Sequence, residues 1–260
     1  ASGVVEEVGT GVDGVSVGDR VAYRGVFGGY AEAAAVPAAS LVPLPDELPL
    51  DIAGGCLTHG MTAHYVTHDA HAVTAGEWIL VHAAAGGTGA LVVQMAKLRG
   101  ATVVATASTA EKRAHAVACG ADHAIDYATG DFETACRDLP GFDGFHAILD
   151  NVSADTFERN LRLLRPCGDL VIFGMSSGPI PPFDLQRLNA LGSLSIRRTN
   201  LKHYVLDRGA LLRRAGAVLD MLAREKLRIT VAGVYPLDRA GEAHEALKGR
   251  RTIGKVLLRP

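Results

Sequence analysis

The most distinctive pattern in the chain is an apolar run, a turn of small residues and an amphipathic stretch at residues 78–100, WILVHAAAGGTGALVVQMAKLRG. Trp78–His82 is rich in residues that favour strands, and Ala90–Arg99 has apolar residues at helical spacing before Gly100 ends it. The turn between them contains Gly86, Gly87, Thr88 and Gly89. Because glycine has no Cβ, the backbone can turn tightly there and a phosphate can approach the amides that begin the helix. The pattern predicts the phosphate-binding corner of a dinucleotide fold.

Strand and helix patterns alternate around this corner. Strand patterns recur at residues 102–106, 123–127, 145–150, 169–173 and 193–198, and helical patterns at 51–69, 154–164 and 206–225. The run at 145–150 is almost wholly apolar, which is typical of a strand buried on both faces of a parallel sheet. The alternation predicts an α/β fold with a Rossmann, doubly wound parallel sheet.

The two ends of the chain show a different pattern. Strand patterns with turn signals between them occupy Gly3–Gly9, Arg20–Tyr23 and Tyr30–Val36, and the C-terminal segment has strand, helix and strand patterns at Ile229–Tyr235, Ala240–Leu247 and Lys255–Leu258. They predict an antiparallel, barrel-like piece. Prolines punctuate Pro37–Pro49, which indicates a connector. We therefore predict a domain at residues 1–48, a dinucleotide-binding domain at 49–204, and a return to the first domain at 205–260.

Composition excludes several classes of partner. The 260 residues are 48% hydrophobic and 21% charged, and the net charge of −2 does not favour nucleic acid or an anionic membrane surface. No apolar run reaches the length of a transmembrane helix, so we expect no membrane partner. The cysteines are Cys56, Cys119, Cys136 and Cys167. Their wide spacing is typical of reduced thiols in the cytoplasm.

Three motifs carry a resemblance to a known family: AAAGGTG at residues 83–89, IFGMSSG at 172–178 and GKVLL at 254–258. They resemble the quinone oxidoreductase branch, zeta-crystallin-like, of the zinc-free medium-chain dehydrogenase/reductases, over essentially the whole chain. The family usually has Val where Thr88 stands, and the threonine adds a hydroxyl that can meet a phosphate. The resemblance implies a partial GroES-like β-barrel domain beside the Rossmann domain. It also implies a chain truncated at the N-terminus, where family members carry part of the active site.

The position after the second strand of the predicted sheet decides between the two nicotinamide cofactors. A carboxylate there would accept the ribose hydroxyls of NAD and repel the 2′-phosphate of NADP. The chain instead has Ser108, Thr109 and Lys112. Lys112 matches the family lysine that meets the 2′-phosphate, and a solvated helix charge is the alternative. We therefore expect NADPH as the cofactor.

The resemblance implies further cofactor contacts. Thr62 would lie close to the nicotinamide, Tyr127 beside the adenosine phosphate, Asn151 at the adenine or ribose, Phe173, Gly174 and Ser176 along the nicotinamide side, and Arg250 at the phosphates. Each has a structural alternative: Thr62 could be a buried helix hydroxyl, and Asn151 could cap the helix at 154–164. Ser177 is expected to shape the turn.

No metal site is expected. Tyr23–Val36 contains no cysteine, so a Cys₄ zinc site cannot form there. Cys56 lies near the position of a catalytic ligand in zinc alcohol dehydrogenases, but a lone cysteine is more often a small buried apolar residue. The spacing of His64, His68 and His71 could place two imidazoles on one helix face, and a solvated helix end is the preferred interpretation.

The predicted function is NADPH-dependent transfer of hydride to a small-molecule quinone or α,β-unsaturated carbonyl, with no residue assigned as catalytic. We expect a homodimer, because the strand at 193–198 resembles the edge strand that often pairs with its twin in the family. The alternatives are an enoyl-thioester reductase of polyketide or fatty-acid type, a zinc alcohol dehydrogenase, and an NADPH-binding protein with little turnover. An acyl-pantetheine channel, a metal analysis and a panel of carbonyl substrates would separate them.

Overall fold

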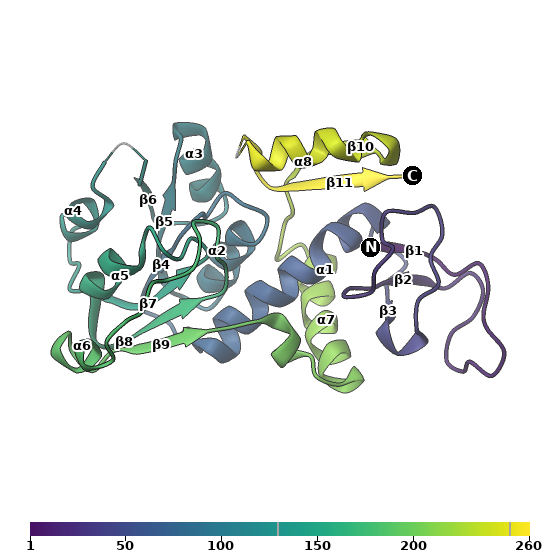
Figure 1. Ribbon diagram of the computed structural model, residues 1–260, viewed down its shortest axis with the longest axis horizontal. Helices are drawn as coiled ribbons and strands as arrows, with labels where there is room; N and C mark the ends of the chain where they lie inside the picture. Colours follow the sequence, from purple (N-terminus) through teal and green to yellow (C-terminus); the bar gives the residue numbers. More distant parts are fainter. Residues whose placement is uncertain (129, 250) are drawn as a thin grey trace. The chain divides into compact units, whose positions relative to one another are not determined.

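The computed structural model describes residues 1–128, 130–249 and 251–260 (Figure 1). The chain forms two compact units, one from Ala1–Met61 with Lys202–Pro260 and the other from Thr62–Leu201. Helix α1 (Leu50–Tyr65) begins in the first unit and ends in the second. No helix in the described ranges is long and apolar enough to cross a membrane. The domain limits predicted from the sequence, 48/49 and 204/205, differ from these unit limits and stay a prediction.

The second unit is built on a six-stranded parallel sheet of order β6-β5-β4-β7-β8-β9. Its strands are β4 (Trp78–Val81), β5 (Thr102–Ala107), β6 (His123–Asp126), β7 (Phe145–Asp150), β8 (Leu164–Ile172) and β9 (Ser195–Arg198). The chain adds strands in one direction from β4 to β6 and then in the other from β7 to β9. This reversal confirms the predicted doubly wound sheet, and ligands of such sheets bind beside the reversal point.

Five helices connect these strands: α2 (Gly89–Leu98), α3 (Ala110–Ala118), α4 (Phe132–Arg137), α5 (Phe157–Leu163) and α6 (Gln186–Ala190). Because parallel crossovers are right-handed, the change of direction puts α2 and α3 on one face of the sheet and α4 and α5 on the other. Both faces are therefore covered, which explains why the central strands are apolar on both sides.

The core of this unit contains a row of apolar side chains that crosses four strands. Leu80 pairs with Val104 on one side and with Ile148 on the other, and Ile148 pairs with Leu170. All four are fully buried, and Phe132, Phe157 and Leu161 from α4 and α5 join the same cluster. Burial of each such side chain contributes roughly 1.5–3 kcal/mol. The row fixes the register of the strands whose ends carry the site.

The first unit contains two small sheets. The antiparallel sheet joins β1 (Ser2–Val4), β2 (Arg20–Ala22) and β3 (Val42–Pro43), and the parallel pair is β10 (Val231–Pro236) with β11 (Lys255–Arg259). Helices α7 (Arg208–Ala223) and α8 (Ala240–Lys248) complete it. Arg208 donates from Nη1 to the carbonyls of Ala38, Ala39 and Leu41, which ties α7 to the short helix η1 (Ala38–Ser40).

Several element predictions need correction. Tyr30–Val36 forms no strand, and within Gly3–Gly9 only the first two residues belong to β1. Most of residues 30–36 are exposed, so the alternation of small apolar residues there has no core to face. The predicted helix at 51–69 changes at Val66 into the π-helical turn η2 (Val66–Ala70). The buried Thr67 hydroxyl donates to the carbonyl of Ala63 at 2.8 Å within this transition.

A candidate dinucleotide-binding site

The turn between β4 and α2 brings the strand end and the helix start into very close approach. Ala83 adopts a left-handed conformation with φ of 51°, and its carbonyl accepts from the Gly86 amide at 3.1 Å. A Cβ on Gly89 would lie 2.9 Å from Cα of Ala84, so only glycine fits there. The Thr88 side chain forms no capping bond, so it does not occupy the first amides of α2. These features leave a helix N-terminus with the geometry that suits a phosphate.

Two backbone hydrogen bonds attach this turn to its neighbours in the sheet. The His82 amide donates to the carbonyl of Leu149 on β7, and the Ala84 amide donates to the carbonyl of Thr106 on β5, each at 3.2 Å. The turn is therefore held between the carboxyl ends of β5 and β7. In a parallel sheet these ends meet at one edge, which is where the predicted site residues of the unit begin.

A fully buried polar network adjoins the turn and was missed by sequence reasoning. It consists of His82, Thr106, Asp150, Thr156 and Asn160. His82 lies 2.8 Å through Nδ1 from the Thr106 hydroxyl and 2.7 Å through Nε2 from Oδ1 of Asn160. Asn160 and Thr156 donate to Oδ2 of Asp150 at 3.0 and 2.7 Å. The available signal was a polar residue at the end of each apolar strand, but the partners could not be paired from spacing.

The network defines the protonation of His82. Burial lowers the pKa of His82 more than the nearby Asp150 charge raises it, so the ring is neutral. Asn160 donates to Asp150 through Nδ2, so its Oδ1 accepts, and Nε2 of His82 carries the ring proton. Nδ1 then accepts from the Thr106 hydroxyl. Every polar atom of the imidazole is satisfied, which fixes the residue directly before the turn.

The loops after β7 and β8 are fastened to each other. Amides of Phe173, Ser176 and Ser177 donate to the carbonyls of Asp150, Asn151 and Val152. The Ser177 hydroxyl donates to the Val152 carbonyl at 2.8 Å and accepts from the Asp155 amide at 3.0 Å. Ser177 therefore shapes the turn, as expected. The predicted contacts Phe173, Gly174 and Ser176 thus lie directly beside Asn151.

Asn151 and Gly174 need one another's shape. A Cβ on Gly174 would overlap the Asn151 side-chain amide and would lie 2.5 Å from the Asn151 carbonyl oxygen. The alternative that Asn151 caps the next helix is wrong, because α5 starts at Phe157 after Thr156. Asp150 instead organises this loop, accepting from the Val152 amide at 2.6 Å.

The residues after β5 form the predicted 2′-phosphate site. Ser108 and Thr109 follow the strand, and the Thr109 hydroxyl caps α3 by accepting from the Lys112 amide at 3.2 Å. Thr109 therefore serves α3, while the Lys112 side chain extends from its first turn and is half-buried. Arg113 forms an ion pair with Asp126 at 2.7 Å. No carboxylate directly follows β5, which suits the doubly charged phosphate of NADP.

The remaining predicted contacts come from other segments. Tyr127 follows β6 and packs partly buried against the core of the second unit. Thr62 is half-buried on α1 and begins the second unit. Arg250 lies outside the described residues. The structure therefore brings the β4–α2 turn, the β5 end and the β7 and β8 loops to one sheet edge, and Thr62 and Tyr127 belong to the same unit.

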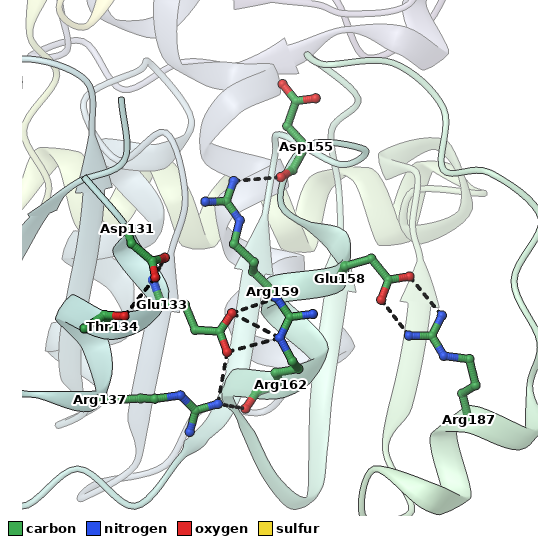
Figure 2. A network of polar contacts seen from close by, with 9 residues as sticks. All are labelled: Asp131, Glu133, Thr134, Arg137, Asp155, Glu158, Arg159, Arg162 and Arg187. Atoms are coloured by element: carbon green, nitrogen blue, oxygen red, sulfur yellow. Dashed lines mark hydrogen bonds and ion pairs between the residues drawn. The ribbon is translucent and has the colours of Figure 1, made fainter. Parts of the chain in front are cut away.

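A charged network fixes the helices α4 and α5 beside the sheet (Figure 2). Glu133 lies between two arginines, accepting from Arg162 at 2.7 Å and from Arg137 at 3.2 Å. The hydrogen bond from Arg162 is the main cause of the lowered pKa of Glu133. The Arg159 guanidinium stacks over the Phe132 ring at 4.3 Å, as a cation–π pair. These contacts hold α5, the helix that supplies Asn160 to the buried network.

The histidines and cysteines form no metal centre in the described ranges of the chain. The expectation of a solvated helix end is wrong for His71, whose side chain is only 12% exposed and lies between Asp169 and Glu77 at 2.7 and 3.1 Å. His64 and His68 stack with ring centroids 4.1 Å apart. Burial raises the pKa of the Cys56 thiol to about 12, which fits its interpretation as an apolar residue.

Comparisons with known proteins agree with this architecture. The zinc-binding dehydrogenase family matches residues 87–211, and the alcohol dehydrogenase GroES-like domain matches residues 1–46. A 2-haloacrylate reductase from a Burkholderia species is 38% identical over 100% of this chain and 79% of its own length. Quinone oxidoreductase 1 of Escherichia coli is 34% identical over 100% of this chain and 80% of its own length.

Solved structures show the same relationship. An Escherichia coli quinone oxidoreductase complexed with NADPH is 34% identical, has a TM-score of 0.95, and is matched over 100% of this chain and 80% of that one. A mycobacterial protein complexed with NADPH is 40% identical, has a TM-score of 0.94, and is matched over 100% of this chain and 81% of that one. The fold and the glycine turn define a dinucleotide-binding medium-chain dehydrogenase/reductase. Within that superfamily, the chain belongs to the quinone oxidoreductase branch.

Proposed function

We propose that this protein is an NADPH-dependent oxidoreductase that reduces a quinone or an α,β-unsaturated carbonyl. The observation that carries the proposal is the glycine turn at the edge of the sheet, followed by a β5 end with Lys112 and no carboxylate. Support also comes from relatives along the whole chain, which are named quinone oxidoreductases and a 2-haloacrylate reductase. Two solved relatives are complexed with NADPH.

The residues of the second unit fit this cofactor. A Cβ at Gly86 would meet only the Ala83 carbonyl at 3.4 Å, and the close packing of Gly89 keeps the first turn of α2 against the strand end. The turn from Gly86 to Gly89 would hold the pyrophosphate with backbone amides, and the Thr88 hydroxyl would add a donor. Ser108 and Lys112 would hold the 2′-phosphate, with Lys112 supplying the charge.

Other residues would orient the two ends of the cofactor. Tyr127 and Asn151 would contact the adenosine half. Backbone groups of Phe173, Gly174 and Ser176 would meet the nicotinamide carboxamide, with Thr62 nearby, and Arg250 would reach the phosphates. NADPH supplies the hydride when it is bound; the protein orients it and excludes water from the reacting atoms.

We further propose a cytoplasmic homodimer. All four cysteines are free, which suits a reducing compartment. Strand β9 is the last strand of its sheet, and three of its four residues are exposed. An edge strand offers unpaired amides and carbonyls to a second copy of itself. Sedimentation of the purified chain tests this proposal, with a single monomeric species as the contrary result.

The activity is tested by the loss of NADPH absorbance with two substrates offered separately, an ortho-quinone and a crotonyl thioester. We expect fast oxidation with the quinone and slow oxidation with the thioester. A preference for the thioester would replace the proposal with an enoyl-thioester reductase. Bound NADPH with no turnover of either substrate, nor of a wider carbonyl panel, would favour a binding protein.

A further inference from the structure

The first unit contains a buried group of titratable side chains that the proposed cofactor site does not use. Nζ of Lys255, at the start of β11, lies 3.2 Å from Nε2 of His59 on α1. Cys56 stands one turn earlier on the same helix and is fully buried. Among the residues described, no carboxylate forms an ion pair with Lys255. The pair is therefore a cation and an imidazole with no compensating negative charge.

The contact between Lys255 and His59 determines which nitrogen of the ring carries the proton. An ammonium group only donates, so Nε2 of His59 accepts. Burial, with a smaller contribution from the Lys255 charge, lowers the pKa of His59 to about 4, so the ring is neutral at physiological pH. A neutral ring that accepts through Nε2 carries its proton on Nδ1. His59 thus presents an Nδ1–H donor.

This donor has no acceptor. Nδ1 of His59 is buried, and no hydrogen-bond partner contacts it within the described part of the chain. Buried polar groups in folded proteins are nearly always paired, and an unpaired one calls for an explanation. A bound molecule with an exposed oxygen would supply the missing acceptor. The lysine behind the ring polarises it and strengthens Nδ1–H as a donor.

The position of His59 on α1 connects it with the proposed cofactor site. His59 and Thr62 are three residues apart on one helix, so their side chains are neighbours, with Cβ atoms about 5–6 Å apart. Thr62 is the residue proposed to lie close to the nicotinamide. An oxygen bound by Nδ1 would therefore lie near the reacting end of the cofactor, and this step rests on the proposed function.

We propose that Nδ1–H of His59, with Lys255 behind it, binds the carbonyl oxygen of an enone or quinone substrate and supplies the proton of the reduction. When the β-carbon of an enone gains a hydride, the carbon–carbon π bond breaks and its electron pair shifts, leaving the charge on the carbonyl oxygen. That oxygen takes the proton from Nδ1, while Nε2 takes one from the Lys255 ammonium. Lys255 is left as an amine and regains its proton from water. One hydride and one proton enter the substrate, which becomes a neutral enol or, from a quinone, a hydroquinone.

The surrounding charges suit this role. Burial lowers the pKa of Lys255, which makes its ammonium a readier proton donor. The Cys56 thiol, with a pKa raised to about 12 by burial, stays neutral and does not neutralise the lysine. The amino group of Ala1 also lies within electrostatic reach of Lys255, and burial and that charge lower its pKa. The net positive potential favours negative charge developing on an oxygen at Nδ1.

Three variants of the full chain test the proposal through kcat with cyclohexenone and with an ortho-quinone. His59→Phe keeps the ring shape and removes the donor, and we expect kcat to fall roughly 10²–10³-fold while NADPH affinity stays unchanged. His59→Asn places an amide N–H near the position of Nδ1 and should recover part of the loss. His244→Phe, at an exposed histidine of the same unit, should keep the parent kcat. A parent-like kcat in His59→Phe would overturn the proposal.

A measurement without turnover separates this proposal from the proposed function. Nitrogen-15 NMR of the folded chain with NADP⁺ follows the His59 ring as cyclohexenone is added, since the oxidised cofactor cannot reduce it. We expect the Nδ1 resonance to shift, and Lys255→Met should raise the pKa of His59 because a repelling cation is gone. No shift on adding cyclohexenone overturns the His59 site, even if the enzyme oxidises NADPH. A clear shift without reduction of any enone or quinone supports the site and refutes the proposed function.

Discussion

Asn151 and Gly174 are packed so closely that the backbone of one occupies the space where a side chain of the other would begin. A Cβ on Gly174 would lie 2.5 Å from the Asn151 carbonyl oxygen and would overlap the Asn151 amide group. The two residues follow β7 and β8, so this contact sets the spacing of the loops proposed to hold the nicotinamide. The ends of two parallel strands are thereby joined without any regular secondary structure.

Replacing Gly174 by alanine should push these loops apart. We expect Gly174→Ala to reduce the free energy of unfolding by about 1–3 kcal/mol, because overpacking forces the backbone to shift. It should also weaken NADPH binding, measured by fluorescence titration. Gly216→Ala is the matched control, since a Cβ there meets nothing within 4 Å on helix α7. That variant should be neutral or more stable, because alanine favours helices. Equal stability of both variants would contradict the packing argument.

Lys112 should discriminate between the two nicotinamide cofactors. We expect Lys112→Ala to weaken NADPH binding by roughly 1.5–3 kcal/mol, the value of hydrogen bonds to a charged group, and to leave NADH binding nearly unchanged. Isothermal titration with each cofactor measures the difference. Lys226→Ala, at an exposed lysine of the other unit, controls for a general loss of positive charge. Equal losses for NADPH and NADH would refute the 2′-phosphate role.

His82 should make the folded state sensitive to acid. Burial lowers its pKa below the ordinary value of 6.5, so the unfolded chain binds a proton that the folded chain resists. The stability from this group is present above the unfolded-state value and is lost as the pH falls toward the folded-state value. His82→Gln should flatten this dependence in urea titrations taken between about pH 7.5 and pH 5.5. An unchanged slope would mean that the buried ring protonates without cost.

Glu77 should contribute stability through the contacts at the start of β4. Burial raises its pKa, but the Thr74 amide and His71 outweigh that effect, so the folded-state value is lowered. The contribution is present above the unfolded-state pKa and is lost as the pH falls through the folded-state value. Glu77→Gln should cost about 1–2 kcal/mol at neutral pH, judged by urea unfolding. Glu245→Gln, in an exposed pair with Lys248, should cost less than about 0.5 kcal/mol.

The sheet could be predicted because its signal is local. The run Phe145–Asp150 was expected as a strand buried on both faces, and β7 has the same bounds. Gly89 could be singled out because the absence of a side chain in a strand–helix turn has few explanations. Periodicity and turn chemistry are properties of neighbouring residues, so they can be read along the chain.

The parts that could not be predicted depend on distant partners. His71 was expected to be solvated because its spacing from His64 and His68 says nothing of Asp169, which lies 98 residues later. His82 and Asn160 pair across 78 residues, and no period in the sequence links them. Tyr30–Val36 failed for the opposite reason, because its alternation is regular but no described core faces it.

The buried network beside the glycine turn has a consequence for how the protein is made. His82 is held by Asn160, and Asn160 in turn by Asp150, so the residue that begins the turn is fixed only after α5 has docked on the sheet. A ribosome-bound chain that ends before Asn160 carries all the glycines of the turn but lacks the partner that completes it. Such a nascent chain should bind NADPH poorly, so the cofactor cannot guide the early steps of folding. It stabilises the second unit only after that unit is almost complete.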